Sequence, residues 1–267
     1  MRGQSVAGVS SLFVQKFSRD INHLAFFPPF DRLPILMSKH LDRAISQLRT
    51  DLVEQFGVVE QMIGLSVRSL TERRPDFADR VLSTDKQVDE TDIRIEEECL
   101  KLLALHQPVA EDLRWVITAV KVNGDLERMA DLACNISERS RALDFFPLFR
   151  VPEHLDDMVR AVLQMVRKGL DSFIEQNVIE ARAVIASDDR VDQLNVILID
   201  ELHALMKEDT ETIEPAIHCF SASRHLERIA DLATNVAEET VYLVNGEIIR
   251  HRHEESRRSR VRQTPQA

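Results

Sequence analysis

Paired carboxylates recur along this sequence at a spacing that suits cation binding. A Glu-x-x-x-Asp pair occurs twice, one hundred residues apart, and an Asp-x-x-x-Asp pair precedes each copy. Side chains four residues apart on a helix lie on one face, so each pair would point in one direction. We therefore predict two clusters of four metal-ligating carboxylates. The first comprises Asp85, Asp89, Glu127 and Asp131, and the second comprises Asp188, Asp192, Glu227 and Asp231.

Antiparallel helices would bring the two pairs of each cluster to one level. If the chain folds back near Pro108, residue 85 lies level with about residue 129, and residue 89 with residue 125. A fold-back near residue 210 places 188 and 192 opposite 232 and 228 in the same way. Two like charges about 4 Å apart cost about 4 kcal/mol at an effective dielectric constant of about 20. Arginines, proton uptake or a cation must offset this repulsion.

The chemistry of a cation site follows from its donor atoms. Oxygen ligands favour hard or borderline cations such as Mg, Mn or Fe over zinc held by thiolates. Asn135, Glu138, Asn235 and Glu238 fall near the same faces as further ligands or neighbours, whereas Cys134 is expected to be a small packing residue. The alternative is a salt-bridge network without metal, and both remain open. Its cations would be Lys86, Arg128, Arg190 and Arg228.

Six long helices are predicted to position these residues. The 267 residues include only 7 Gly and 9 Pro, and the prolines fall between long segments with apolar residues at helical spacing. Gly246 stands where a glycine would end the last helix. The predicted helices span residues 39–72, 77–105, 109–143, 153–174, 177–207 and 212–246.

An internal duplication sets the predicted domain organisation. Residues 125–138 match residues 225–238 at nine of fourteen positions, and residues 85–89 match 188–192 in the same order. The fold class is therefore all-α, with two tandem three-helix bundles over residues 37–148 and 149–249. Residues 1–36 are predicted to be a disordered N-terminal extension and residues 250–267 a flexible basic tail.

Composition disfavours several classes of protein. A net charge of −11 argues against nucleic-acid binding, which requires a basic surface. Three scattered cysteines indicate reduced thiols in a cytosolic protein, and no apolar run is long enough to span a membrane. No histidine lies three residues after a glutamate, and no phosphate loop or nucleophile motif occurs, so the chain is not expected to be an enzyme.

Several motifs resemble the PhoU family of regulators of bacterial phosphate uptake. The resemblance runs from Met37-Ser-Lys-His-Leu-Asp through Gln107-Pro-Val-Ala-Glu-Asp-Leu-Arg114 and both Leu-Glu-Arg-(Met/Ile)-Ala-Asp motifs, and ends near His251. It covers about four fifths of the chain and implies two three-helix bundles with metal ions on the acidic motifs. Multinuclear iron is the implied metal, with Mg, Mn and Zn as alternatives.

The same resemblance implies partners and a role. A cytoplasmic protein would contact the ATPase subunit of a phosphate ABC transporter and a phosphate-sensing histidine kinase, peripheral to the membrane through these partners. It would repress the phosphate-starvation response when phosphate is plentiful. Exposed apolar helix faces favour a homodimer. The second motif departs from the family by having Leu232 where a histidine is frequent. The alternative function is a non-metal helical scaffold with salt-bridged acidic pairs.

Overall fold

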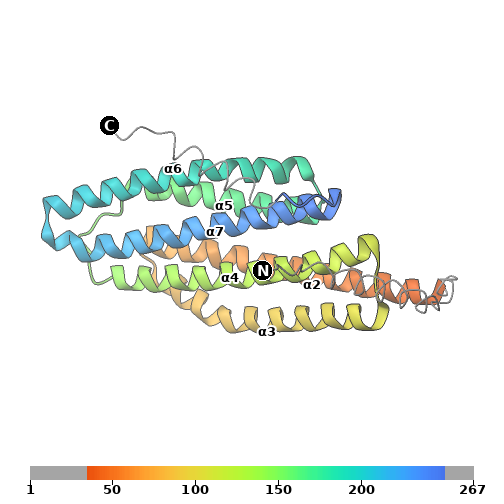
Figure 1. Ribbon diagram of the computed structural model, residues 1–267. Coiled ribbons are helices and arrows are strands. Elements are labelled where there is room, and N and C mark those ends of the chain that lie inside the picture. The colour runs from red at the N-terminus through yellow and green to blue at the C-terminus, as the bar shows by residue number, and fades with distance from the viewer. Residues whose placement is uncertain (1–34, 250–267) are drawn as a thin grey trace, which may run out of the picture. The chain divides into compact units, whose positions relative to one another are not determined.

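The computed structural model of the chain describes residues 35–249, which contain six long helices and no strand (Figure 1). The predicted all-α fold class is thereby confirmed. A short 3-10 turn, η2 (Thr210–Thr212), precedes the last helix. The helices are α2 (Ile35–Glu72), α3 (Pro75–His106), α4 (Ala110–Leu143), α5 (Glu153–Ile174), α6 (Val178–Glu208) and α7 (Ile213–Asn245).

Local chemistry explains where several helices begin and end. Pro75 is the first residue of α3, where its missing N–H has no helical partner to lose. The Asn177 side chain accepts hydrogen bonds from the backbone N–H groups of Ile179 and Glu180, at 3.1 and 3.2 Å, and so caps the start of α6. Gly246 ends α7 with φ of 69°, and its N–H donates to the Tyr242 carbonyl at 2.8 Å, as predicted for a C-cap glycine.

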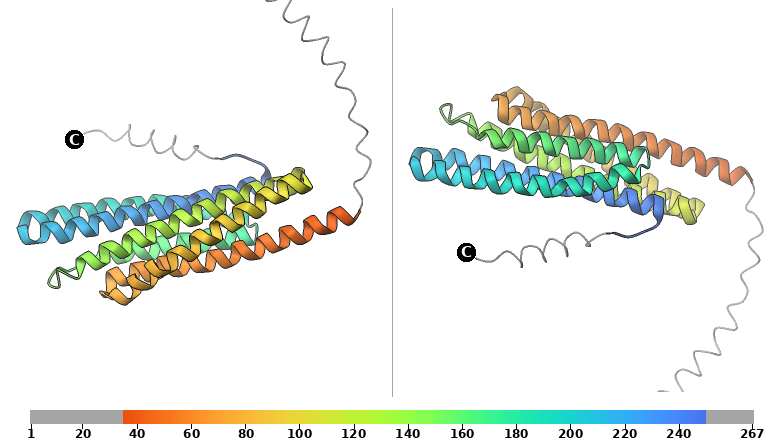
Figure 2. Two further views of the ribbon diagram at one scale, coloured as in Figure 1. Left: turned by 90° about the horizontal axis from the view of Figure 1, so that it is seen from below. Right: turned by 90° about the horizontal axis from the view of Figure 1, so that it is seen from above.

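The chain divides into two units between residues 42 and 43. Of the first unit the structure describes only residues 35–42, which are helical. Within the second unit, residues 43–72 of α2 form one three-helix bundle with α3 and α4, and α5, α6 and α7 form the other, as Figure 2 shows from two sides. The tandem arrangement predicted from the duplication is therefore confirmed.

The two bundles pack against each other through the helices that carry the acidic motifs. Helices α4 and α7 lie side by side. Lys121 of α4 forms an ion pair with Glu239 of α7, Nζ to Oε2 at 3.4 Å, and the Glu239 side chain is only 4% exposed. Phe56 of α2 meets Phe173 of α5 edge to face, with ring centroids 5.8 Å apart. The core is thus continuous between the bundles.

Some predictions concern parts of the chain that the structure does not describe. The proposed N-terminal extension lies outside the described residues except for 35 and 36, which belong to α2, and the basic tail lies wholly outside them. The division between the bundles at residues 148 and 149 stays a prediction. No helix within residues 35–249 has the combination of length and apolar composition that a membrane span requires.

Candidate functional site

The first acidic cluster lies between α3 and α4. Asp85 and Asp89 of α3 are within electrostatic range of Asp131 on α4, and Asp89 is also within range of Glu127. All four carboxylates predicted for this site therefore gather on one side of the helix pair. The antiparallel packing of α3 and α4 through their tight turn produces this, as the fold-back register predicted.

Burial and mutual repulsion perturb the carboxylates on α4. Partial burial raises the pKa of Asp131, and the charges of Asp85 and Asp89 raise it further. The pKa of Glu127 is also raised, first by burial and then by the charge of Asp131. Arg128 opposes this rise in the Glu127 pKa, but it is the weakest of the contributions. Carboxylates whose pKa values are raised by burial and by one another are expected at a site that attracts cations or protons.

Two members of this cluster were missed by the sequence prediction. Asp92 of α3 is within electrostatic range of both Glu127 and Asp89, and burial raises its pKa. Asn123 Nδ2 donates hydrogen bonds to Asp92 Oδ1 at 2.6 Å and to the Asp92 carbonyl oxygen at 3.0 Å. The sequence could have indicated Asp92, because it follows Asp89 by three residues and so lies on the same helix face. The predicted register also sets residue 92 level with residue 122.

Cys134 also contacts the cluster. Its thiol donates a hydrogen bond to Asp85 Oδ1, with Sγ 3.3 Å from the oxygen. Burial, followed by this bond and the neighbouring carboxylates, raises the pKa of the thiol. Cys134 is therefore a polar neighbour of the cluster in addition to the packing residue that was predicted. The second copy has Thr234 at the corresponding place, with its hydroxyl buried and without a partner in the described chain.

The second acidic cluster has a different electrostatic environment. Asp188 of α6 is buried, Asp192 is half-buried and Asp231 is exposed, on two helices that pack together. Glu227 forms an ion pair with Arg224, one turn earlier on α7, with Nη1 2.5 Å from Oε2. The first copy has Gly124 at the place of Arg224, one hundred residues earlier. Arg224 thus neutralises one carboxylate of the second cluster, and the first cluster has no arginine at the equivalent position.

The donor atoms of the first cluster are carboxylate oxygens with one thiol beside them. Such a set fits a hard or borderline divalent cation. Within residues 35–249, no three His, Cys, Asp or Glu side chains are already close enough together to hold a metal ion. The structure therefore brings the predicted ligands to one place but not into a finished coordination shell.

Comparison with known proteins gives a consistent family assignment. The PhoU domain matches residues 52–140 and 155–240, one match in each bundle. The phosphate-specific transport system accessory protein PhoU homolog of Aquifex aeolicus is 36% identical over 213 residues, which cover 80% of this chain and 96% of that protein. The Escherichia coli protein PhoU is 31% identical over 80% of this chain and 91% of its own length.

Solved structures show the same relationship in three dimensions. The crystal structure of PhoU from Pseudomonas aeruginosa superposes with a TM-score of 0.75 at 32% identity, covering 77% of this chain and 99% of that one. The regulatory protein PhoU from Streptococcus pneumoniae gives a TM-score of 0.73 at 28% identity. The duplicated domain, the sequence identity and the helical arrangement agree, and the chain belongs to the PhoU family.

Proposed function

We propose that this chain is an accessory regulator of phosphate transport that represses the phosphate-starvation response when phosphate is abundant. The observation that carries the proposal is the PhoU domain present twice, each copy with its acidic motif on the helix at the interface between bundles. Relatives named as accessory proteins of the phosphate-specific transport system support this role. The chain would act by binding partners, without catalysis.

Two partners are proposed from the family resemblance. One is the ATPase subunit of a phosphate ABC transporter, and the other is a phosphate-sensing histidine kinase. The chain would work in the cytoplasm as a homodimer and reach the membrane only through these partners. Long helices with exposed apolar residues, such as Ile93 and Leu100 of α3, offer surface for such contacts.

Deletion of the gene tests the regulatory role directly. We expect a deletion strain to express phosphate-starvation genes in high phosphate, and the full-length gene to restore repression. Co-purification of the tagged chain at high and low phosphate, with identification of the captured proteins, tests the bridge. Unchanged expression in the deletion strain would remove the regulatory proposal, whereas capture of only one of the two partners would remove the bridge alone.

We further propose that the acidic clusters bind metal ions. Asp85, Asp89, Glu127 and Asp131 would hold a cation in the first cluster, and the corresponding residues Asp188, Asp192, Glu227 and Asp231 in the second. Burial and then mutual repulsion raise the pKa values of Glu127 and Asp131, and a bound cation would offset both effects and tie α3 to α4. Iron is the expected metal, with Mg, Mn and Zn as alternatives.

Metal content after reconstitution tests this proposal. Purified metal-free protein would be incubated with Fe²⁺, Mn²⁺, Mg²⁺ or Zn²⁺, desalted and subjected to elemental analysis. We expect the double variant Glu127→Gln/Asp131→Asn to retain less metal than wild type. The matched control, Glu153→Gln/Asp156→Asn, removes two exposed charges at the start of α5 and should retain the wild-type amount. Equal metal content in all three proteins would rule out these ligands.

A helical scaffold without metal is the second candidate. The ion pair of Arg224 with Glu227 favours it, because an arginine already neutralises a predicted ligand of the second cluster. This candidate predicts that chelators and added divalent cations leave the thermal stability unchanged. Binding of a cation at one hundred times its Kd would instead stabilise the protein by about 2.7 kcal/mol.

A further inference from the structure

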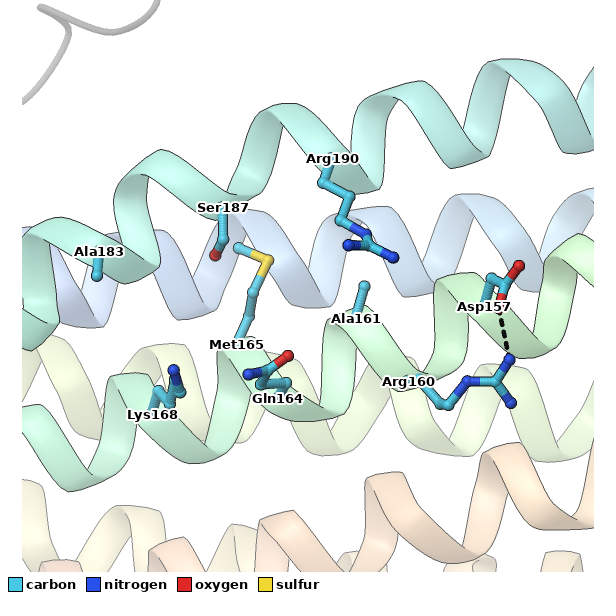
Figure 3. A pocket seen from close by; sticks show the side chains of 9 residues that line it. All are labelled: Asp157, Arg160, Ala161, Gln164, Met165, Lys168, Ala183, Ser187 and Arg190. Carbon is cyan, nitrogen blue, oxygen red and sulfur yellow. Dashed lines mark hydrogen bonds and ion pairs between the residues drawn. The ribbon is translucent and has the colours of Figure 1, made fainter.

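A basic groove lies between α5 and α6, on the second bundle. It has a volume of about 270 Å³ and is lined by three cationic side chains and one carboxylate. The cations are Arg160 and Lys168 of α5 and Arg190 of α6. Figure 3 shows Arg190 and Ser187 extending from α6 toward α5, with Gln164 and Lys168 on the opposite wall. A concentration of positive charge is unexpected on a chain with a net charge of −11.

The cations of this groove are only partly neutralised. Arg160 forms an ion pair with Asp157, one turn earlier on α5, with Nη2 2.5 Å from Oδ1. Lys168 and Arg190 form no ion pair with any carboxylate of residues 35–249. The groove therefore carries about two uncompensated positive charges. Uncompensated cations on facing helices repel each other, and an anion between them would remove this repulsion.

The duplication shows that these charges are not required by the fold. The two domain matches begin at residues 52 and 155, and Asp85 corresponds to Asp188, so equivalent positions lie 103 residues apart in this part of the chain. Leu52 with Leu155, and Gln61 with Gln164, agree with this spacing. At the same spacing, the three cations Arg160, Lys168 and Arg190 replace Gly57, Leu65 and Gln87 of the first bundle.

Spacing along α5 indicates the size of the ligand. Arg160 and Lys168 are eight residues apart, which corresponds to about 12 Å along a helix. Arg190 reaches toward α5 between them, beside Ala161 (Figure 3). A single small anion would contact Arg190 with one of the other two cations, whereas an anion with two charged groups would engage all three. Arginine forks suit phosphoryl oxygens, and a lysine adds a point charge.

We propose that this groove binds a small anion that carries a diphosphate group. The source is either inorganic pyrophosphate or the diphosphate of a nucleoside diphosphate. Arg190 would contact the centre of the diphosphate, while Arg160 and Lys168 contact its two ends. Gln164 and Ser187 supply an amide and a hydroxyl at the groove wall. This binding does not depend on the regulatory role or on the acidic clusters, because none of their residues lines the groove.

Titration calorimetry on the full chain in excess chelator tests the proposal, since the chelator removes any contribution from bound metal. The ligands are pyrophosphate, ADP and inorganic phosphate. We expect saturable binding of a diphosphate in the micromolar to low-millimolar range, weaker binding of inorganic phosphate, and loss of affinity as salt rises. Tighter binding of ADP than of pyrophosphate would identify a nucleoside diphosphate as the source, and the reverse would identify pyrophosphate.

The specific test replaces two of the groove cations, each with the residue found at the equivalent position of the first bundle. Arg190→Gln and Lys168→Leu should each weaken diphosphate binding roughly tenfold. The matched control Arg167→Gln removes a cation of α5 outside the groove and should bind as wild type. All of these side chains are exposed, so the thermal midpoints should stay unchanged. Absence of saturable diphosphate binding, equal affinity for inorganic phosphate, or equal losses in the Arg167→Gln control would overturn the proposal.

Discussion

Asn123 of α4 donates hydrogen bonds from Nδ2 to both the side chain and the backbone of Asp92 on α3, at 2.6 and 3.0 Å. The Asn123 side chain is almost wholly buried, at 1% exposure. This amide therefore joins the two helices of the first acidic cluster. It also lowers the pKa of Asp92, against the larger effects of burial and neighbouring carboxylates that raise it.

Replacing this amide should destabilise the first bundle. Asn123→Ala leaves the Asp92 carboxylate without its donor, and we expect the free energy of unfolding to fall by about 1–3 kcal/mol. Urea denaturation followed by circular dichroism measures the change. Asn135→Ala is the matched control, because Asn135 lies on the same helix and is only half-buried, so its loss should cost less than about 0.5 kcal/mol. Equal losses for the two variants would contradict a special role for Asn123.

Stability in the absence of metal should depend on pH through Glu127 and Asp131. Folding raises both pKa values above their ordinary 4.5 and 3.8, so the native state binds protons more tightly than the unfolded chain. The free energy of unfolding contributed by these groups is therefore greatest below their ordinary pKa values. It is lost as the pH rises through the raised values. We expect wild-type stability from these groups to decline above about pH 4 in chelator.

Neutral side chains should abolish this part of the pH dependence. Glu127→Gln/Asp131→Asn should be more stable than wild type at pH 7 in chelator, by less than about 1 kcal/mol, because water screens partly exposed charges. Near pH 3.5 the two proteins should be equally stable. Denaturation midpoints across this range measure the difference, and Glu153→Gln/Asp156→Asn is the control. A wild type that is more stable than the double variant at pH 7 without metal would contradict the repulsion inferred for this cluster.

The three cysteines should react slowly in the native protein. Cys99 and Cys219 are buried, and burial raises the pKa of each thiol to about 12. The pKa of Cys134 is raised as well. Since the thiolate is the reactive form, maleimide at pH 7 should label none of them within minutes, and all three in denaturant. Ala104→Cys adds an exposed thiol on α3 and should label at once. Rapid labelling of Cys99 or Cys219 in the native wild type would contradict their burial.

Sequence patterns were sufficient to predict the number of long helices and their positions along the chain. Prolines, apolar periodicity and the C-cap Gly246 gave helix ends within a few residues of those observed, because these signals act locally along the chain. The largest difference is at α2, which begins at Ile35 rather than at residue 39. Pro34 directly precedes that start, so the sequence does contain a signal for the observed beginning of α2.

Contacts between helices were harder to predict than the helices themselves. The acidic pairs were found because each pair has a fixed spacing on its own helix. Two contacts could not be predicted in this way: the hydrogen bond from Asn123 to Asp92 and that from the Cys134 thiol to Asp85. Both depend on how α3 and α4 are rotated about their axes and aligned lengthwise, which only the packed structure defines. The Arg224–Glu227 ion pair is local, at a spacing of three residues, and could have been predicted from the sequence.

Two helical glycines, one in each bundle, should respond differently to alanine. Gly169 of α5 packs against α7, and an added Cβ would lie 3.2 Å from the Ala233 carbonyl oxygen, which belongs to the rigid α7 backbone. Gly64 of α2 has no atom within 4 Å of the same position. Alanine relieves the entropic cost of glycine in a helix, by about 1 kcal/mol, at either site. Only at Gly169 does overpacking oppose this gain, by about 1–3 kcal/mol.

We therefore expect Gly64→Ala to raise the free energy of unfolding by about 1 kcal/mol, and Gly169→Ala to leave it unchanged or lower it by up to about 2 kcal/mol. Urea denaturation of both variants beside wild type measures the difference, and the two effects should add in the double variant because the sites share no contact. If Gly169→Ala stabilised the protein as much as Gly64→Ala, α5 and α7 would have to separate at Ala233 without cost. That result would contradict the overpacking penalty inferred from the close approach of Gly169 to Ala233.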